Sequence, residues 1–456
     1  EPGSYYPLIA ERARYAEDYS WMEIALNPRA RFHDGTPITS EDVAFSIMAI
    51  KANHPFKAMY APVSGVDTPD PYTAVIRLSK PHPAILLCMS PVLCPIMPKH
   101  VYGTDPNIRQ NPANKAPIGS GPFKFVEWKP GDYIMLEKNK DFFIKGKPHV
   151  DRVIIKIIPD MNNRVMAVER GEVDAMPFFD SLREVKRLSG DKNLVVTNKG
   201  YAGIGSLDWV AFNTGKKPFD DVRVRQAAAY AIDRNFFAKV IMMGLVTPSA
   251  TPITPFSPFY TKDVNMYDVN LEKAKKLLDE AGYPVKADGT RFTVTVDYAP
   301  GSPTTKMMAE YLKPQLAKVG IDAKIRISPD FGTWAERVSN YNFDITTDNV
   351  FNWGDPVIGV HRTYSSANIV KGVPFSNTQQ YRNPKVDAIM EQAASEVDNE
   401  KRAKLYKEFQ QIVMNDVPIY FMTTTAYHTI YNKRVGNVPA SIWGFLAPYM
   451  DVYLKK

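Results

Sequence analysis

The sequence predicts an α/β protein of two lobes, with an extra α/β subdomain in the first lobe. Apolar runs typical of strands alternate with amphipathic helices along most of the 456 residues, as expected when helices cover sheets. This length is sufficient for more than one hydrophobic core. A late strand beginning at Pro418 would carry the chain back to the first lobe. We therefore expect the extra subdomain at residues 1–116, the core sheet of the first lobe at 117–215 and 422–456, and the second lobe at 216–421.

The extra subdomain is predicted from local patterns. Residues 21–26 alternate between apolar and polar side chains, which is the period of a half-buried strand. The pair Asp34-Gly35 is a turn signal and leads to residues 39–42, whose hydroxyl and carboxyl groups suit the start of a helix. A second strand is expected at residues 72–78. His33 beside Asp34 could suggest acid–base chemistry, but its position in a turn before a helix favours a structural role.

The sheet of the first lobe is predicted from a β-β-β-α-β pattern. Strands are expected within residues 119–128, at 132–137 and at 153–158, followed by a helix at 161–169. The pattern ends at the apolar run 209–212, which we expect to be the strand that leaves the first lobe.

The second lobe is predicted to open with two helices. Asp220 or Asp221 can cap a helix that begins at about Val222, and Asp233 can cap a second one over residues 235–243. Strands and helices then alternate, and the peptide DNVFNWGDP is expected to be a loop. The later helices are expected at 271–281, 308–316, 385–395 and 400–414, and the later strands at 292–296, 323–327, 343–345 and 418–422.

Five stretches of sequence carry a family resemblance. They are LNPRARFHDGTPITSEDVAFS, GSGPFKFVEW, AFNTGKKPFDDVRVRQAAAYAIDR, LEKAKKLLDEAGY and YRNPKVDAIM, and they extend over nearly the whole chain in this order. With these stretches the sequence resembles the family 5 extracellular solute-binding proteins, which are the peptide, dipeptide and nickel receptors of ABC importers.

The resemblance implies a two-lobed fold of the periplasmic-binding-protein type and a role in transport rather than catalysis. A monomeric receptor in the periplasm, or at the outer face of the cytoplasmic membrane, would close about its hinge on a peptide-like or other small organic solute. It would deliver this ligand to the permease subunits of an ABC transporter, and no cofactor is implied. The family carries several dozen residues ahead of this point, so we also expect that the chain begins inside the mature protein and lacks part of the site.

Composition and motifs argue against other functional classes. The 56 Lys and Arg and 49 Asp and Glu give a net charge of +7, but the basic residues are scattered, so nucleic-acid binding is not expected. No stretch approaches the ~20 apolar residues of a membrane span. The 7 histidines lack metal-ligand spacing, and neither a phosphate-binding glycine loop nor a nucleophile elbow is present. Cys88 and Cys94 could form a disulfide in an oxidising compartment or stay buried thiols in a reducing one.

Aromatic and polar residues at loops and strand ends are the candidate ligand contacts. Aromatic rings cover apolar cargo at a low cost in conformational entropy. Core packing is the preferred interpretation of Trp209 and Trp334, whereas the position of Trp353 in a polar loop favours ligand contact. Asp355, before a proline, is expected to hold this loop in place. The predicted ligand-binding residues are Trp209, Trp334, Phe351, Asn352, Trp353, Asp355 and Trp443.

The resemblance also indicates which solute to exclude. In the dipeptide branch of the family an Asp binds the α-amine of the ligand and an Arg binds its carboxylate. The matching positions here are Asn352 and Ala299, so both charges are absent. A buried charged terminus left unpaired costs several kcal/mol. We therefore expect an amide-bearing, blocked, longer or non-peptide solute that stacks on Trp353 and is hydrogen-bonded by Asn352, rather than a free dipeptide.

Two alternatives stay open. The resembled family includes nickel-chelate and haem-type carriers, which would show metal or colour in the purified protein. A hydrolase acting in the same cleft is the second alternative, and it would return an added ligand chemically changed.

Overall fold

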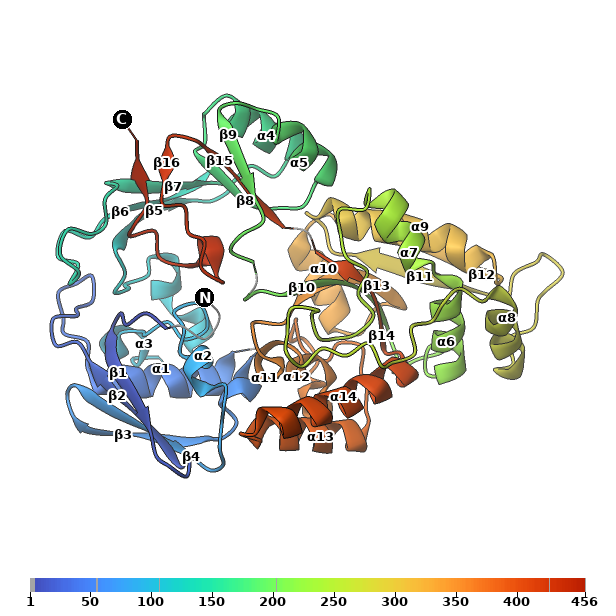
Figure 1. Cartoon of the computed structure of the whole chain (residues 1–456), viewed down its shortest axis with the longest axis horizontal. Helices are drawn as coiled ribbons and strands as arrows, with labels where there is room; N and C mark the ends of the chain where they lie inside the picture. Colours follow the sequence, from blue (N-terminus) through green and yellow to red (C-terminus); the bar gives the residue numbers. More distant parts are fainter. Residues whose placement is uncertain (1–4, 55, 106, 202, 426, 456) are drawn as a thin grey trace. The chain divides into compact units, whose positions relative to one another are not determined.

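The computed structural model of the protein describes residues 5–54, 56–105, 107–201, 203–425 and 427–455. The chain forms two compact units, whose elements are labelled in Figure 1. The first unit comprises Glu1–Phe179, Glu184–Gly203 and His428–Lys456, and the second comprises Asp180–Arg183 and Ile204–Tyr427. Each unit contains both helices and sheets, which confirms the predicted α/β class.

Four antiparallel strands form the first sheet of the first unit. Their order is β1 (Ala10–Tyr15), β2 (Trp21–Leu26), β4 (Thr73–Leu78) and β3 (Val63–Asp70). The alternation along β2 buries Met22, Ile24 and Leu26, as predicted. Helix α1 (Ser40–Asn53) packs on β3 and β4. It begins at a capping box, in which the amide and the hydroxyl of Thr39 both donate to the Asp42 carboxylate, and this confirms the predicted helix start.

Two further antiparallel sheets complete the first unit. Strands β5 (Phe123–Lys129), β6 (Tyr133–Lys138) and β7 (Arg152–Lys156) form one sheet, and β15 (His428–Asn432) lies between β8 (Ala175–Phe179) and β9 (Leu194–Thr197) in the other. Helix α4 (Met161–Glu169), which has the predicted bounds, packs on β8 and β15. The shorter elements are α2 (Ile85–Cys88), α3 (Lys99–Tyr102), β16 (Val435–Gly436), β17 (Tyr453–Leu454) and α5 (Leu182–Leu188), which includes residues of both units.

The two cysteines are buried thiols. Neither Cys88 nor Cys94 takes part in a disulfide, so the structure favours the second of the two alternatives. Burial raises the pKa of the Cys94 thiol to about 11, which keeps it protonated and unreactive at neutral pH.

The second unit is built on one mixed sheet of five strands. The order is β12 (Ile321–Arg326), β11 (Phe292–Tyr298), β13 (Ile345–Phe351), β10 (Ser206–Phe212) and β14 (Ile419–Thr424). β11 runs parallel to β12 and β13, whereas β10 runs antiparallel to β13 and β14. Every residue of β10 and β14 is buried, as expected for strands that are covered on both faces.

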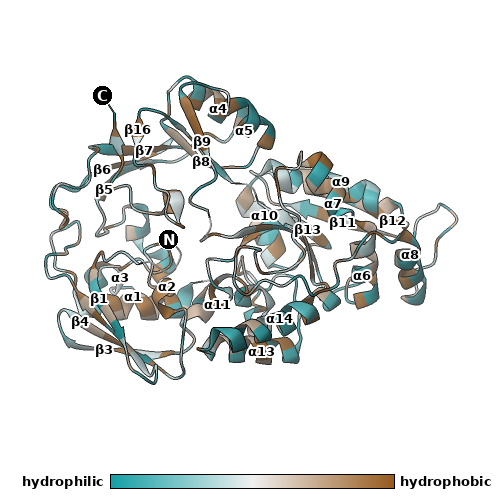
Figure 2. Ribbon diagram, in the orientation of Figure 1, coloured by the Kyte–Doolittle hydropathy of each residue, from teal (hydrophilic) through white to brown (hydrophobic). Residues whose placement is uncertain are grey.

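The helices of the second unit largely follow the predictions. The side chains of Asp221 and Asn270 cap α6 and α8 as predicted. The helix expected at 235–243 is instead a short α-helix that continues as a π-helical turn at Phe237–Ile241. In Figure 2 both α13 and α14 carry teal and brown residues, as amphipathic helices do. The helices are α6 (Val222–Ala231), α7 (Arg234–Phe236), α8 (Leu271–Glu280), α9 (Pro303–Ala317), α10 (Phe331–Ser339), α11 (Pro356–Gly359), α12 (His361–Tyr364), α13 (Pro384–Ser395) and α14 (Asn399–Asp416).

The boundaries between the units differ from those expected. We expected residues 117–215 and 422–456 in the first lobe, but the second unit begins at Ile204 and ends at Tyr427. The reason is strand pairing, because β10 is hydrogen-bonded to both β13 and β14 and therefore belongs to the second sheet. Pairing with β10 also makes the first four residues of DNVFNWGDP part of β13 instead of a loop.

Candidate ligand-binding site

One edge of the five-stranded sheet collects polar and aromatic side chains. β10 starts beside the ends of β13 and β14, with Ser206 opposite Phe351 and Leu207 opposite Thr424. β11 runs in the same direction as β13, so its carboxyl end lies at this edge too. In open α/β sheets, ligands bind beyond the carboxyl ends of the strands. The residues that define this sheet edge are Asp208, Asp348, Asn349, Phe351, Trp353 and Tyr427.

Asp208 is a carboxyl group in the middle of a buried strand. Its two oxygens accept hydrogen bonds from the hydroxyls of Thr423, at 2.7 Å, and Thr425, at 2.6 Å. Burial raises the pKa of Asp208 to about 7, since the two hydroxyls offset only part of the desolvation and the charge of Asp180 acts in the same direction as burial. Asp208 therefore titrates near neutral pH.

Asp348 is a second buried carboxyl group on the neighbouring strand. It accepts a hydrogen bond of 2.7 Å from the amide of Asn349. Burial raises its pKa to about 7 despite the positive charge of Arg362. Arg362 is itself buried on α12, and desolvation lowers the pKa of its guanidinium to about 10. Two buried carboxyl groups, Asp208 and Asp348, thus lie at the sheet edge with one buried guanidinium, that of Arg362.

Three aromatic residues meet at the same edge. The ring of Phe351 lies 5.5 Å from the ring of Trp353 and 6.2 Å from that of Tyr427, both in edge-to-face geometry. The Tyr427 hydroxyl accepts a hydrogen bond of 2.7 Å from the side-chain amide of Asn349. Trp353 has a backbone φ of 53°, in the left-handed region that a bulky side chain rarely adopts. Such strain is typical of functional positions.

Asn352 is turned into the protein and fixes a neighbouring loop. Its side-chain oxygen accepts from the amide of Thr254 at 2.7 Å, and its side-chain nitrogen donates to the carbonyl of Pro252 at 3.1 Å. A Cβ at Gly359 would lie 2.3 Å from the Asn352 backbone, so only glycine permits this close approach. Asn352 is 4% exposed, and both ends of its amide are already engaged with backbone groups.

Asp355 is part of a buried ion pair. Its carboxylate accepts two hydrogen bonds from the Arg402 guanidinium, at 2.7 and 2.8 Å, and a third from the amide of Val357. Burial by itself would raise the pKa of Asp355, but the Arg402 charge outweighs this effect and the pKa is lowered. Asp355 therefore anchors the loop, which is the structural role predicted for it, and its carboxylate is occupied by Arg402.

The three other predicted tryptophans lie outside the segment 351–355. Trp209 packs in the core with its ring 6.4 Å from that of Phe421, and Trp334 packs against Ala299 while its indole N–H donates to the Thr346 hydroxyl. Both positions fit the core interpretation. Trp443 belongs to the first unit. Phe351, Asn352, Trp353 and Asp355 thus belong to one segment, and Trp209 and Trp334 make core contacts within the second unit.

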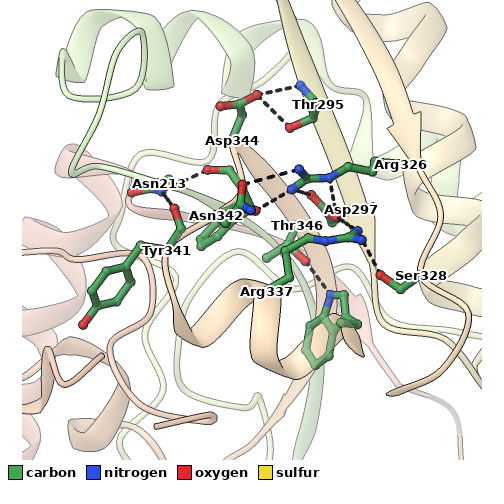
Figure 3. Close-up of polar contacts among 12 residues, drawn as sticks. Asn213, Thr295, Asp297, Arg326, Ser328, Arg337, Tyr341, Asn342, Asp344 and Thr346 are labelled. Atoms are coloured by element: carbon green, nitrogen blue, oxygen red, sulfur yellow. Dashed lines mark hydrogen bonds and ion pairs between the residues drawn. The ribbon is translucent and has the colours of Figure 1, made fainter. Parts of the chain in front are cut away.

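A second polar cluster of the second unit surrounds Asp297 on β11 (Figure 3). The Asp297 carboxylate accepts from Arg326 at 3.0 and 2.8 Å and from Arg337 at 2.8 Å. Arg337 also donates to the Ser328 hydroxyl. Both oxygens of this carboxylate accept hydrogen bonds from arginines of the protein, so we assign the cluster a structural role.

Sequence reasoning missed Asp208, Asp348 and Tyr427. A signal for Asp208 was present, because a carboxylate inside the apolar run SLDWVAF is unusual in a buried strand. No local pattern marks Tyr427, which reaches the edge only because β14 pairs with β10. Within the residues that the structure describes, no three His, Cys, Asp or Glu side chains are grouped so that they could hold a metal ion. The same residues include no helix with the length and apolar character of a membrane span.

The family of the chain is clear from comparison with known proteins. Residues 4–371 match the model of the bacterial extracellular solute-binding proteins, family 5. The chain belongs to this family, which confirms the resemblance seen in its sequence motifs. The relatives described below are binding proteins.

Individual relatives show how widely the bound solutes differ. The chain is 29% identical to the oligopeptide-binding protein AppA of Bacillus subtilis, over 91% of this chain and 77% of AppA. It is 28% identical to the heme-binding protein A of Haemophilus influenzae, over 97% of this chain and 83% of the relative. Among solved structures, AppA with a bound nonapeptide superposes with a TM-score of 0.86 at 26% identity, covering 98% of this chain and 90% of AppA. NikZ from Campylobacter jejuni with Ni(L-His) gives a TM-score of 0.85 at 25% identity, covering 95% and 86%. These likenesses confirm the predicted periplasmic-binding-protein fold.

Proposed function

We propose that this protein is the solute receptor of an ABC importer, in the periplasm or at the outer face of the cytoplasmic membrane. It captures a peptide-like or other small organic solute as a monomer and presents it, chemically unchanged, to the permease subunits. The observation that carries the proposal is the family match over residues 4–371. Relatives named for oligopeptide, dipeptide and glutathione binding support a peptide-like cargo.

The part of the solute site in the second unit is the aromatic group Phe351, Trp353 and Tyr427. Its rings offer apolar faces, and the strained backbone of Trp353 marks it as held in place for a purpose other than packing. Asn352 receives a different role from the one expected. Its amide binds the backbone at Pro252 and Thr254, so it positions the loop behind Trp353 in preference to contacting the solute.

The solute is proposed to lack the two free termini of an ordinary dipeptide. Position 352 carries a neutral amide, and Ala299 is buried against Trp334 with no group to offer a carboxylate. A charged terminus desolvated at either position would have no counter-charge there. An amide-bearing, blocked, longer or non-peptide solute avoids this cost.

The test is to identify and then vary the solute. Native mass spectrometry of the purified protein should reveal any bound molecule, and a thermal-shift screen should compare free dipeptides with their N-acetylated forms. We expect blocked or longer molecules to raise the Tm more than free dipeptides do. Tight binding of free dipeptides that disappears on N-acetylation would contradict the proposal.

Matched variants locate the site. Trp353→Ala should weaken binding of the solute found in the screen, whereas Trp128→Ala, which removes a surface tryptophan that is 45% exposed on β5, should leave binding unchanged. Equal effects of the two variants would exclude the sheet edge as the stacking surface.

Experiments distinguish two alternatives, a carrier of the same family and an enzyme, from this proposal. A nickel-chelate or haem-type carrier would purify with metal or with visible absorbance. A hydrolase would convert the solute on incubation, so recovery of the unchanged molecule by mass spectrometry distinguishes a receptor from an enzyme.

A further inference from the structure

Strands β8 and β15 pair where the chain crosses between the two units (Figure 1). The chain leaves the first unit after Phe179, the last residue of β8, and returns to it at His428, the first residue of β15. These two residues pair with each other, and the next pair along the strands is Met176 with Ile430. The step between the pairs is one residue longer on β8 than on β15, so the ladder contains a β-bulge. The regular backbone pairing is therefore interrupted beside both crossings.

The bulge lies at two residues of β8. Pro177 and Phe178 together stand opposite the single residue Thr429 of β15. Proline has no N–H group to donate to a ladder. Phe178 has a backbone φ of 55°, in the left-handed region that a bulky side chain rarely adopts. Such a conformation persists only where the surrounding structure holds it.

The hydroxyl group of Tyr201 fills the interruption in the ladder. It accepts a hydrogen bond of 2.9 Å from the amide of Phe178 and donates one of 3.1 Å to the carbonyl of His428. A third hydrogen bond of 2.7 Å joins it to the hydroxyl of Thr429. With Thr429 as the donor of that bond, the Tyr201 oxygen uses its proton and both of its lone pairs. One side chain thus links β8 to β15 where their own pairing is broken.

Tyr201 is itself close to a third crossing. It lies two positions before Gly203, after which the chain passes into the second unit at Ile204. Its ring makes an edge-to-face contact with the ring of Phe178, with 5.4 Å between the ring centres. Burial raises the pKa of the Tyr201 hydroxyl, so the proton that it donates to His428 stays in place at physiological pH. The hydroxyl therefore joins three of the segments that connect the two units, on the side of the first unit.

We propose that Tyr201 is the positioning residue of the hinge. Its hydroxyl fixes the directions in which three connecting segments leave the first unit, so that the second unit turns about one defined pivot. The inference rests on the proposed function, because a receptor that closes on its solute needs such a pivot. Loss of the hydroxyl leaves both units folded and widens the range of orientations between them.

The test is the distribution of distances between the two units in the ligand-free protein. Spin labels are attached to cysteines introduced by Lys129→Cys on β5 and Lys276→Cys on α8, whose side chains are 61% and 78% exposed. The natural thiols of Cys88 and Cys94 are buried and so are protected from the label. Pulsed electron paramagnetic resonance then gives the width of the distance distribution. No solute is used, so this result and the search for the cargo succeed or fail separately.

Tyr201→Phe is the main variant, because it keeps the ring and removes only the hydroxyl. We expect a broader distance distribution than in the wild-type protein, with both units still folded. Tyr431→Phe is the matched control on β15, since the Tyr431 hydroxyl forms no hydrogen bond within the described part of the chain. It should keep the wild-type width. Equal widths in Tyr201→Phe and wild type, or equal broadening in both variants, would overturn the proposal.

Hydrogen exchange separates a hinge role from a purely local one. In Tyr201→Phe the amide of Phe178 should exchange faster by up to about tenfold, the effect of one lost hydrogen bond. Faster exchange without a broader distance distribution would show that Tyr201 only supports the local fold, and would contradict the proposal. Thr429→Val keeps Tyr201 and removes one of its partners, so it also serves if Tyr201→Phe does not fold. It should broaden the distribution by a smaller amount, and an unchanged width would count against the hinge role.

Discussion

Asp297 and Asp208 lie on two strands of the same sheet, and each is 0% exposed. Asp297 faces two arginines, which together direct three hydrogen bonds at its carboxylate (Figure 3). Asp208 accepts hydrogen bonds from two hydroxyl groups and lies near a second acidic residue, Asp180. Hydroxyls can satisfy a protonated or an ionised carboxyl, whereas guanidinium groups stabilise only the ionised one.

The difference shows how the same side chain serves two purposes. A buried carboxylate with its counter-charges in place is a fixed structural link, and removal of either partner leaves an uncompensated charge. A buried carboxyl without a counter-charge keeps its proton up to neutral pH and can change state. Asp208 is of the second kind, and it lies at the sheet edge that we propose as the solute site. A change in its protonation would therefore occur where the solute binds.

The largest effect is expected at the third buried carboxylate, Asp355. Asp355→Ala would leave the Arg402 guanidinium, whose side chain is 3% exposed, without its counter-charge. We expect a loss of about 3–5 kcal/mol in the free energy of unfolding, measured by urea denaturation. Glu272→Ala, at a carboxylate that is 86% exposed on α8, is the control and should have little effect. A loss under about 1 kcal/mol at Asp355 would show that burial does not govern the strength of these pairs.

A smaller loss is expected at Asp297. Its two arginines are partly exposed, at 32% and 20% of their side chains, so water can compensate some of the lost pairing. Asp297→Asn should reduce the free energy of unfolding by about 2–3 kcal/mol at neutral pH. Asp208→Asn is the informative comparison. At neutral pH Asp208 is either protonated or ionised at an energetic cost, so a neutral amide in its place should not lower the free energy of unfolding. Equal losses of unfolding free energy in Asp297→Asn and Asp208→Asn would show that the arginine partners do not make the two carboxyl groups different.

The pH dependence of stability follows from the buried carboxyl groups of Asp208 and Asp348. Asp208 and Asp348 both have a pKa of about 7 in the folded state, well above the value in an unfolded chain. Stability should therefore be greater at pH 5.5 than at pH 8.5, by about 2 kcal/mol for each of the two groups. Urea denaturation at the two pH values provides the measurement, and the double variant Asp208→Asn/Asp348→Asn should flatten the difference. Stability that rises over this range would indicate that other groups dominate.

The smallest effect is expected from the strained backbone of Trp353. Trp353→Gly and Trp353→Ala remove the same indole, but only glycine adopts a φ of 53° without strain. The glycine variant should be more stable than the alanine variant by about 1 kcal/mol, while both lose solute binding. An alanine variant as stable as the glycine variant would show that the left-handed conformation is not costly here.

Local sequence predicted the local structure well. Thr39, Asp221 and Asn270 cap helices as expected, because a cap depends on side chains and amides within three residues. The apolar run around Trp209 predicted a strand, since strand formation follows the hydrophobic pattern. It did not predict the correct lobe, because the partners of β10 are β13 and β14, which lie far along the chain.

The same limit applies to the candidate site. Asn352 was predicted to contact solute, yet its amide binds Pro252 and Thr254, about a hundred positions away in the sequence. Asp355 was predicted to hold its loop, and it does, but its partner Arg402 could not be inferred from a turn motif. Side-chain roles depend on which distant group completes the hydrogen bonds.

The sequence alone determined the α/β class, most of the element positions and the family, because periodicity, capping residues and long motifs are properties of neighbouring residues. Only the tertiary structure decided which carboxyls are balanced and which are not. Asp208, Asp297 and Asp355 are the same residue type, but folding brings arginines to two of them and hydroxyls to the third. Desolvation and pairing act through space, and strand order sets those distances.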